Sequence, residues 1–138
     1  MKQYIEQNRD RFFEELFSIL RIPSISAKQE NKPDMVRCAE RLRELLLEAG
    51  ADMAEVMPTA GNPVVFGRKI VDPAYKTVLV YGHYDVQPPE PLEKWRTDPF
   101  EPVIHDDAIW CRGANDDKGQ LFMHIKAFEY LVRTGQLK

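Results

Sequence analysis

The sequence lacks the features that mark secreted, membrane-spanning or disulfide-rich proteins. It has only two cysteines, Cys38 and Cys111, which lie far apart and form no CxxC pair, so neither a disulfide framework nor a thiolate zinc site is expected. No run approaches the roughly 18 apolar residues that cross a bilayer. The N-terminal stretch MKQYIEQNRDRFFEELF carries charges throughout and has no apolar core, unlike a signal peptide. We therefore expect a cytoplasmic protein with reduced thiols and no membrane partner.

The charge balance and the glycine pattern argue against two further classes of partner. The 19 basic and 22 acidic residues are well mixed and give a net charge of -3, whereas a nucleic-acid-binding surface shows as a basic stripe. Gly113 and Gly119 fit neither the G-x-G-x-x-G nor the P-loop pattern, so phosphate binding is not expected. Ser24 and Ser26 have no Ser-His partner pattern, which leaves serine hydrolysis unsupported.

What the sequence does contain is the pattern of one globular α/β domain. Its 138 residues, 43% hydrophobic and 30% charged, suit a single soluble domain. Apolar residues at helical spacing predict helices over residues 2–20, 33–49 and 117–133. Strands are predicted over 52–57, 63–70 and 76–83, and a hairpin is predicted from 100–105 and 108–112. The prolines between residues 86 and 99 predict a loop.

The apolar run KTVLVYGH carries the strongest strand prediction. Its apolar and β-branched residues, Thr77 to Tyr81, predict a strand buried on both faces in the middle of an α/β sheet. His83 and Asp85 follow at its end, in VYGHYDVQPP. Residues two apart on an extended segment point to the same side. The ends of central strands face the crevice where open α/β sheets bind ligands.

His83 and Asp85 therefore have the spacing of a metal ligand and its supporting carboxylate. A metal-bound imidazole usually donates its second N–H to a carboxylate, which fixes the tautomer of the ring. The alternative is an ordinary strand end, at which His83 is hydrogen-bonded and Asp85 begins a turn. The pair taken alone favours this alternative, because short motifs produce many false positives.

A second candidate stretch is CRGANDDKGQ, residues 111–120. Asp116 is placed to reach the same crevice and to bridge two cations about 3.5–4 Å apart, as two-metal hydrolases require. In the alternative, Asp116 caps the following helix, the negative charge of Asp117 interacts favourably with the positive N-terminal end of that helix, and Lys118 is a solvated helix residue. The other candidates are expected to be structural: His105 in a hairpin turn, His124 beside a solvated Lys126, Cys111 as a small buried residue, and Trp95 and Phe100 pinning the loop after His83.

Taken together, the motifs resemble those of a known enzyme family. GHYDVQPP, then WRTDPFEP from Trp95 to Pro102, then CRGANDDKG resemble the co-catalytic zinc peptidase family of carnosinase-type dipeptidases, glutamate carboxypeptidase, aminoacylase and succinyl-diaminopimelate desuccinylase. The resemblance begins near Arg9, is strongest from Val78 to Gly119, and is most similar to the dipeptidase branch. It implies an α/β catalytic domain with a three-layer mixed β-sheet and flanking helices, as in zinc exopeptidases.

The resemblance implies a role for three residues. His83 matches the histidine that binds one zinc ion, Asp85 the catalytic aspartate that holds that imidazole, and Asp116 the carboxylate that bridges both zinc ions. Asp116 follows His83 by 33 residues, in agreement with the family pattern, and the bond between Asp116 and Asp117 is expected to be cis. The implied activity is hydrolysis of dipeptides or short peptides by a water that two zinc ions activate, with N-acyl amino acids as alternative substrates.

The chain departs from the family pattern after Asp116. The family completes its site with two adjacent glutamates, one of them the general base, then a further acidic ligand and a distant histidine, and it carries an inserted second domain. We expect residues 1–138 to be the N-terminal portion of the catalytic domain. On their own they are expected to bind zinc weakly and to hydrolyse nothing, because tight zinc sites use three or four protein ligands. The alternative is a non-catalytic fragment that self-associates as a homo-oligomer through an incomplete sheet.

Overall fold

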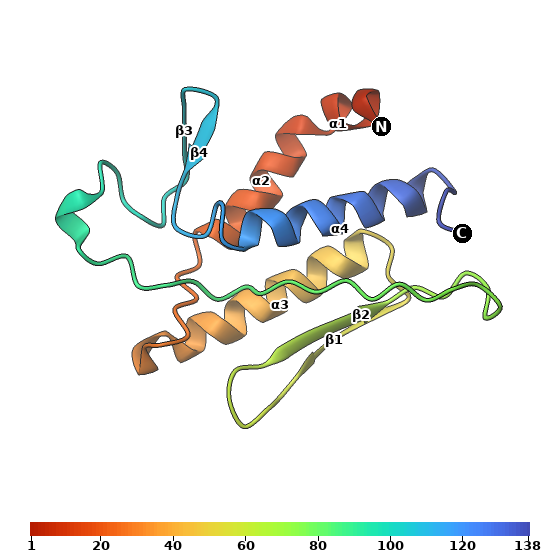
Figure 1. The fold of residues 1–138 in the computed structure, drawn as a ribbon, viewed down its shortest axis with the longest axis horizontal. Helices are drawn as coiled ribbons and strands as arrows, with labels where there is room; N and C mark the ends of the chain where they lie inside the picture. Colours follow the sequence, from red (N-terminus) through yellow and green to blue (C-terminus); the bar gives the residue numbers. More distant parts are fainter.

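The fold combines helices packed around one core with two small antiparallel sheets. The computed structural model describes residues 1–138. Figure 1 shows α3 lying between α4 and the β1–β2 sheet. No helix is both long enough and apolar enough to cross a bilayer. The elements are α1 (Lys2–Gln7), α2 (Arg9–Leu20), α3 (Lys32–Glu48), β1 (Met53–Met57), β2 (Val64–Arg68), β3 (Val103–His105), β4 (Ala108–Trp110) and α4 (Lys118–Arg133), with 3₁₀ turns at Gln29–Asn31 and Leu92–Lys94.

The predicted helices are confirmed, with a difference in two of them. The helix predicted over residues 2–20 is divided at Asn8, whose φ of -110° and ψ of 10° are not helical. Its side-chain amide donates to the Tyr4 carbonyl at 2.8 Å, a local bond that competes with the helical one. At the start of α4 the capping position belongs to Asp117 and not to Asp116.

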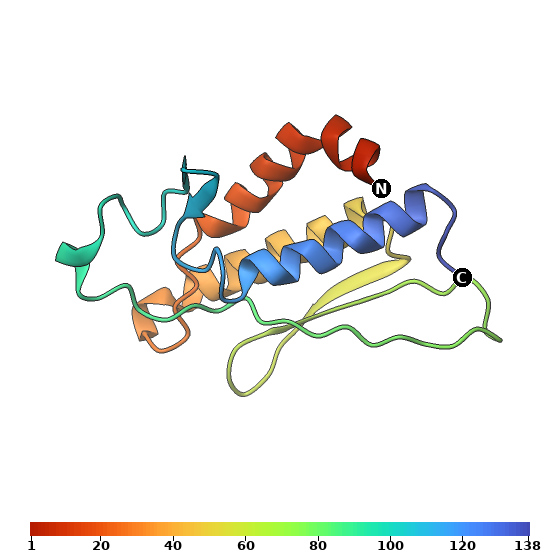
Figure 2. The same ribbon diagram turned by 45° about the horizontal axis from the view of Figure 1, so that its top comes forward.

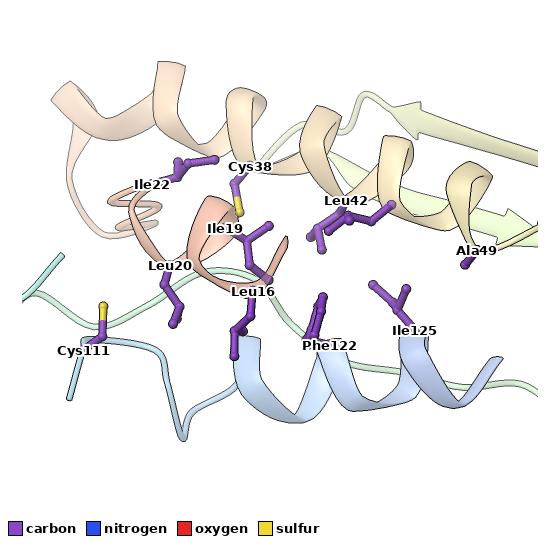
Figure 3. Packing of buried hydrophobic residues seen from close by; sticks show 11 residues of the cluster. Leu16, Ile19, Leu20, Ile22, Cys38, Leu42, Ala49, Cys111, Phe122 and Ile125 are labelled. Carbon is purple, nitrogen blue, oxygen red and sulfur yellow. The ribbon is translucent and has the colours of Figure 1, made fainter. Parts of the chain in front are cut away.

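The core lies where α2, α3 and α4 meet. Apolar side chains of the three helices point toward one another in Figure 3, and each one that is fully buried stabilises the fold by about 1.5–3 kcal/mol. The opposite side of α3 covers the β1–β2 sheet, where Leu46 lies close to the backbone of Gly67. The core residues are Leu16, Ile19, Leu20, Ile22, Cys38, Leu42, Leu45, Ala49, Cys111, Phe122 and Ile125.

Both short sheets follow their sequence patterns. β1 pairs antiparallel with β2, with Met53 opposite Arg68, and β3 pairs antiparallel with β4, with Val103 opposite Trp110. The turn between β3 and β4 has positive φ at both central residues, Asp106 and Asp107, which is typical of a tight hairpin. The hairpin prediction and the α/β class are confirmed, and the sheets formed within these residues are both two-stranded.

The prediction of a buried strand over residues 76–83 is wrong for this chain. The segment forms no strand, and the side chains of Val78 and Leu79 are 81% and 87% exposed. Figures 1 and 2 show it as an extended ribbon without a strand arrow, running from the loop after β2 toward the Leu92–Lys94 turn. A strand buried on both faces needs neighbours at its edges and layers above and below. Residues 1–138 supply no partner strand for this segment, so its apolar side chains stay exposed although their sequence pattern is that of a buried strand.

A buried ion cluster joins α1, α2 and α4. Glu129 is 2% exposed and accepts hydrogen bonds from Tyr4 (2.7 Å), Arg11 (2.5 Å) and Lys126 (2.6 Å). Lys126 also pairs with Glu15, so the prediction of a solvated Lys126 is wrong. Burial by itself raises the pKa of Glu129, but these three hydrogen bonds outweigh it and lower the pKa to about 2.

Candidate functional site

The structure brings His83, Asp85 and Asp116 together. The Nδ1 atom of His83 lies 2.9 Å from Oδ1 of Asp85, and its Nε2 atom lies 3.2 Å from Oδ1 of Asp116. The imidazole therefore has a carboxylate at each nitrogen. Burial lowers the pKa of His83, but the hydrogen bond that the ring donates to Asp85 and the charges of the neighbouring aspartates outweigh it, so the pKa is raised above its usual value.

Asp116 lies at the open side of this arrangement. Its side chain is 80% exposed, against 41% for His83 and 37% for Asp85. The bond between Asp116 and Asp117 is cis, as the family resemblance implies. Asp117 turns the other way, and its Oδ2 accepts a hydrogen bond from the backbone N–H of His83 at 3.0 Å. Two consecutive aspartates thus contact both the ring and the backbone of His83.

The segment that carries His83 is fixed by the serines that follow α2. Ser24 Oγ donates to the Tyr84 carbonyl at 2.6 Å, and the Val86 N–H donates to the Ser24 carbonyl at 2.9 Å. Ser26 Oγ donates to Oδ2 of Asp85 at 2.5 Å. Sequence reasoning missed these contacts, because a Ser-x-Ser stretch shows no pattern that points to residues about 60 positions away.

Lys118 is a second residue whose position the sequence did not reveal. The alternative interpretation of this stretch makes it a solvated helix residue, but it is fully buried, and its ammonium donates to the carbonyls of Ile19 (2.8 Å) and Ile22 (2.7 Å). Burial lowers its pKa. These bonds reach one carbonyl in the last turn of α2 and one just after the helix ends. They tie the start of α4, immediately after the two aspartates, to the helix end from which Ser24 and Ser26 continue.

The loop that carries Asp116 depends on a close backbone contact at Gly119. A Cβ atom at Gly119 would lie 2.0 Å from the carbonyl oxygen of Ala114, closer than any real contact. Gly119→Ala is therefore expected to displace residues 114–117 and to lower the free energy of unfolding by about 3 kcal/mol, measured by urea denaturation. Gly135→Ala is the matched control, since it adds only positive-φ strain and meets nothing within 4 Å, and it should cost about 1 kcal/mol. Equal losses in the two variants would contradict the close contact.

A hollow lies beside the site, between the loop after His83 and the β3–β4 hairpin. Its volume is about 570 Å³. Trp95 supports one wall, because its indole N–H donates to the Pro89 carbonyl at 2.8 Å and the Arg112 guanidinium lies 5.2 Å from its ring centre. The hollow borders Asn115, the residue before Asp116. Its lining residues are Lys94, Trp95, Arg96, Thr97, Ile109, Trp110, Cys111, Ala114 and Asn115.

The remaining candidate residues take no part in this arrangement. His105 is exposed at the end of β3, and its Nε2 atom lies 3.3 Å from Oδ2 of Asp106. His124 is exposed on α4. Cys111 is buried, and its Sγ donates to the Pro99 carbonyl at 3.2 Å. Cys38 is also buried and unpaired.

Few side chains at the site could act as metal ligands. No group of three or more His, Cys, Asp or Glu side chains is arranged to hold a metal ion. An imidazole nitrogen and a carboxylate oxygen do converge, at His83 and Asp116, and Asp85 orients the imidazole from behind. This pair is a chemically suitable half of a site for a borderline metal ion such as zinc.

Comparison with known proteins finds similarity to peptidases. Residues 79–138 match the model of Peptidase family M20/M25/M40. The chain is 35% identical to the Cys-Gly metallodipeptidase DUG1 of Candida albicans, over 95% of this chain and 30% of that protein. It is 31% identical to the Beta-Ala-His dipeptidase of Homo sapiens, over 91% of this chain and 27% of that protein.

A solved structure gives the same result in three dimensions. The di-peptidase Dug1p from Saccharomyces cerevisiae superposes with a TM-score of 0.86 at 31% sequence identity, covering 97% of this chain and 31% of that one. The expected catalytic-domain fold is thereby confirmed over the length of this chain. The chain spans about 30% of the length of the relatives it matches. The sequence match, the fold match and the motifs around His83 and Asp116 agree: over the part of its relatives that it spans, the chain is similar to members of peptidase family M20/M25/M40.

Proposed function

We propose that the protein is a zinc-dependent metallopeptidase that hydrolyses the amide bond of dipeptides or short peptides. The observation that carries the proposal is the convergence of His83 Nε2 and Asp116 Oδ1 at 3.2 Å, with His83 Nδ1 held by Asp85. The relatives support the activity, since those compared above are named as a Cys-Gly metallodipeptidase and a Beta-Ala-His dipeptidase.

The residues of the site suit the proposed metal. His83 presents one ring nitrogen as a ligand while Asp85 accepts the proton of the other, which keeps the ring in one tautomer and raises its basicity. Asp116 offers two carboxylate oxygens, enough to bridge two cations. When bound, the metal ions would polarise the scissile carbonyl and lower the pKa of an attacking water. Asp85, which the family resemblance implies as the catalytic aspartate, would act here by orienting the ligand.

The site needs donors beyond the ones that converge here. Tight zinc sites use three or four protein ligands, whereas residues 1–138 bring only His83 and Asp116 together as candidate ligands. We propose that residues 1–138 form the N-terminal portion of the catalytic domain, and that the other ligands, the general base and an inserted second domain belong to the part of the relatives' length that this chain does not span. The isolated 138-residue chain is then expected to bind zinc weakly and to be inactive.

The buried thiols support the proposed compartment. Cys38 and Cys111 are both free and buried, and disulfides are rare in the reducing cytosol. A cytoplasmic location therefore fits the thiol state in this structure.

A chelator experiment tests the proposed function. The protein with its complete catalytic domain is expected to hydrolyse Cys-Gly or β-Ala-His, to lose the activity in EDTA, and to recover it with added Zn²⁺. The assay should include N-acetyl amino acids, which the proposal expects to be poorer substrates. Hydrolysis that persists after the metal content, measured by mass spectrometry, has fallen to zero would contradict the proposal.

A further inference from the structure

We propose that Ser26 is a positioning residue of the metal site, acting on His83 through Asp85. Ser26 lies in the loop between α2 and α3 and is remote in sequence from both residues. Its hydroxyl donates to Oδ2 of Asp85 at 2.5 Å, while Oδ1 of the same carboxylate lies 2.9 Å from Nδ1 of His83. Because this role presupposes a metal ligand at His83, it rests on the proposed function.

The two contacts divide the carboxylate of Asp85 between two partners. One oxygen is occupied by the Ser26 hydroxyl and the other faces the imidazole. A carboxylate with a fixed partner on each oxygen cannot turn about its terminal torsion without breaking a hydrogen bond, and that torsion is otherwise broad. Ser26 therefore keeps Oδ1 of Asp85 directed at Nδ1 of His83.

The Ser26–Asp85 contact matters more because the backbone around His83 has few other contacts that hold it. Residues 77–81 lack a partner strand in this chain, so no sheet ladder fixes the segment that leads to His83. The segment after His83 is held instead by the loop after α2. Ser24 contributes backbone and hydroxyl bonds to residues 84 and 86, and Ser26 alone of the two serines contacts the carboxylate. Ser24 thus fixes the chain and Ser26 fixes the functional group.

The chemical consequence appears at the far side of the imidazole. With Oδ1 of Asp85 as acceptor, the proton of the neutral ring stays on Nδ1, and the lone pair of Nε2 faces Asp116. Without the Ser26 hydroxyl, Asp85 is free to rotate and the ring is free to exchange tautomers. Fewer molecules then present Nε2 as a ligand, which weakens metal binding.

The test compares Ser26→Ala with Ser24→Ala, which removes a hydroxyl from the same loop but leaves the carboxylate contact in place. Zn²⁺ affinity is measured for the protein with its complete catalytic domain by competition with a chromophoric chelator. Ser26→Ala is expected to weaken Zn²⁺ binding on the order of 10-fold, the lower end for partners of metal ligands. Ser24→Ala is expected to lower the melting temperature with a much smaller change in affinity. Ser26→Thr, which keeps a hydroxyl, should retain most of the wild-type affinity.

A second measurement is independent of metal binding. In the metal-free protein, at one pH that is high enough for the ring to be neutral in both proteins, the ¹⁵N shifts of the His83 ring should report the Nδ1–H tautomer in the wild type and a mixture in Ser26→Ala. Unchanged affinity and an unchanged tautomer in Ser26→Ala would overturn the role of Ser26, as would equal losses of affinity in the two alanine variants. A wild-type protein that binds no Zn²⁺ would instead refute the proposed function.

Discussion

Asp116→Asn is expected to lower kcat/KM for a dipeptide substrate by about a thousandfold or more. The asparagine amide keeps the size of the side chain but removes the negative charge and one of the two oxygens that a bridging ligand needs. Metal ions supply several kcal/mol of transition-state stabilisation, and about 4 kcal/mol corresponds to a thousandfold in rate. The measurement is steady-state kinetics on the protein with its complete catalytic domain, together with its metal content.

The control for this variant is Asp106→Asn. Asp106 is an exposed aspartate in the β3–β4 turn with a φ of 50°, a conformation that asparagine tolerates well. Its rate and metal content should match those of the wild type. If Asp116→Asn kept more than a tenth of the wild-type kcat/KM with full metal occupancy, Asp116 would not be a bridging ligand.

Glu129→Gln is expected to have the largest effect on stability. Glu129 is 2% exposed and is the common acceptor for Tyr4, Arg11 and Lys126. Removing the charge of Glu129 leaves Arg11 and Lys126 to share Glu15 as their one remaining counter-charge in the cluster, and breaking a buried charged network in this way costs about 3–5 kcal/mol. Urea denaturation measures the loss, which is a large fraction of the free energy of unfolding of a typical domain, about 5–15 kcal/mol.

Glu44→Gln is the matched control for the charge removal. Glu44 pairs with Arg41 at 3.0 Å, but its side chain is half exposed, so the change should stay within about 0.5 kcal/mol. Similar losses in Glu129→Gln and Glu44→Gln would show that the buried cluster contributes no more than a surface pair.

The same cluster predicts how stability depends on pH. The pKa of Glu129 is about 2 in the fold against an ordinary 4.5, so the folded state holds its proton less tightly than the unfolded state. Its contribution is complete above about pH 4.5 and is lost as the pH falls toward 2, in total about 3 kcal/mol. The free energy of unfolding, measured by urea denaturation at several pH values, should therefore fall less steeply from pH 5 to pH 2 in Glu129→Gln than in the wild type. Parallel curves would contradict the lowered pKa.

Much of the fold could be predicted from the sequence, because its patterns are local. The helical spacing of apolar residues located α2, α3 and α4, and the HDDA stretch located the β3–β4 turn. Three motifs in a fixed order pointed to the peptidase family and to the cis bond after Asp116, and the spacing of His83, Asp85 and Asp116 identified residues that the structure brings together. Each of these features can be recognised without knowing which distant segments meet.

Other features were decided only by the tertiary structure. The apolar run from Thr77 to Tyr81 predicts a buried strand, yet a strand is buried only where other segments cover it, and residues 1–138 supply none. Lys118 and Lys126 have the sequence pattern of solvated helix residues, but both are buried. The ammonium of Lys118 donates to two backbone carbonyls near the end of α2. The ammonium of Lys126 pairs with two glutamates. The Ser26–Asp85 contact joins residues 59 positions apart. Sequence patterns report how a residue relates to its near neighbours, whereas the partner of a buried charge or hydroxyl depends on which elements pack together.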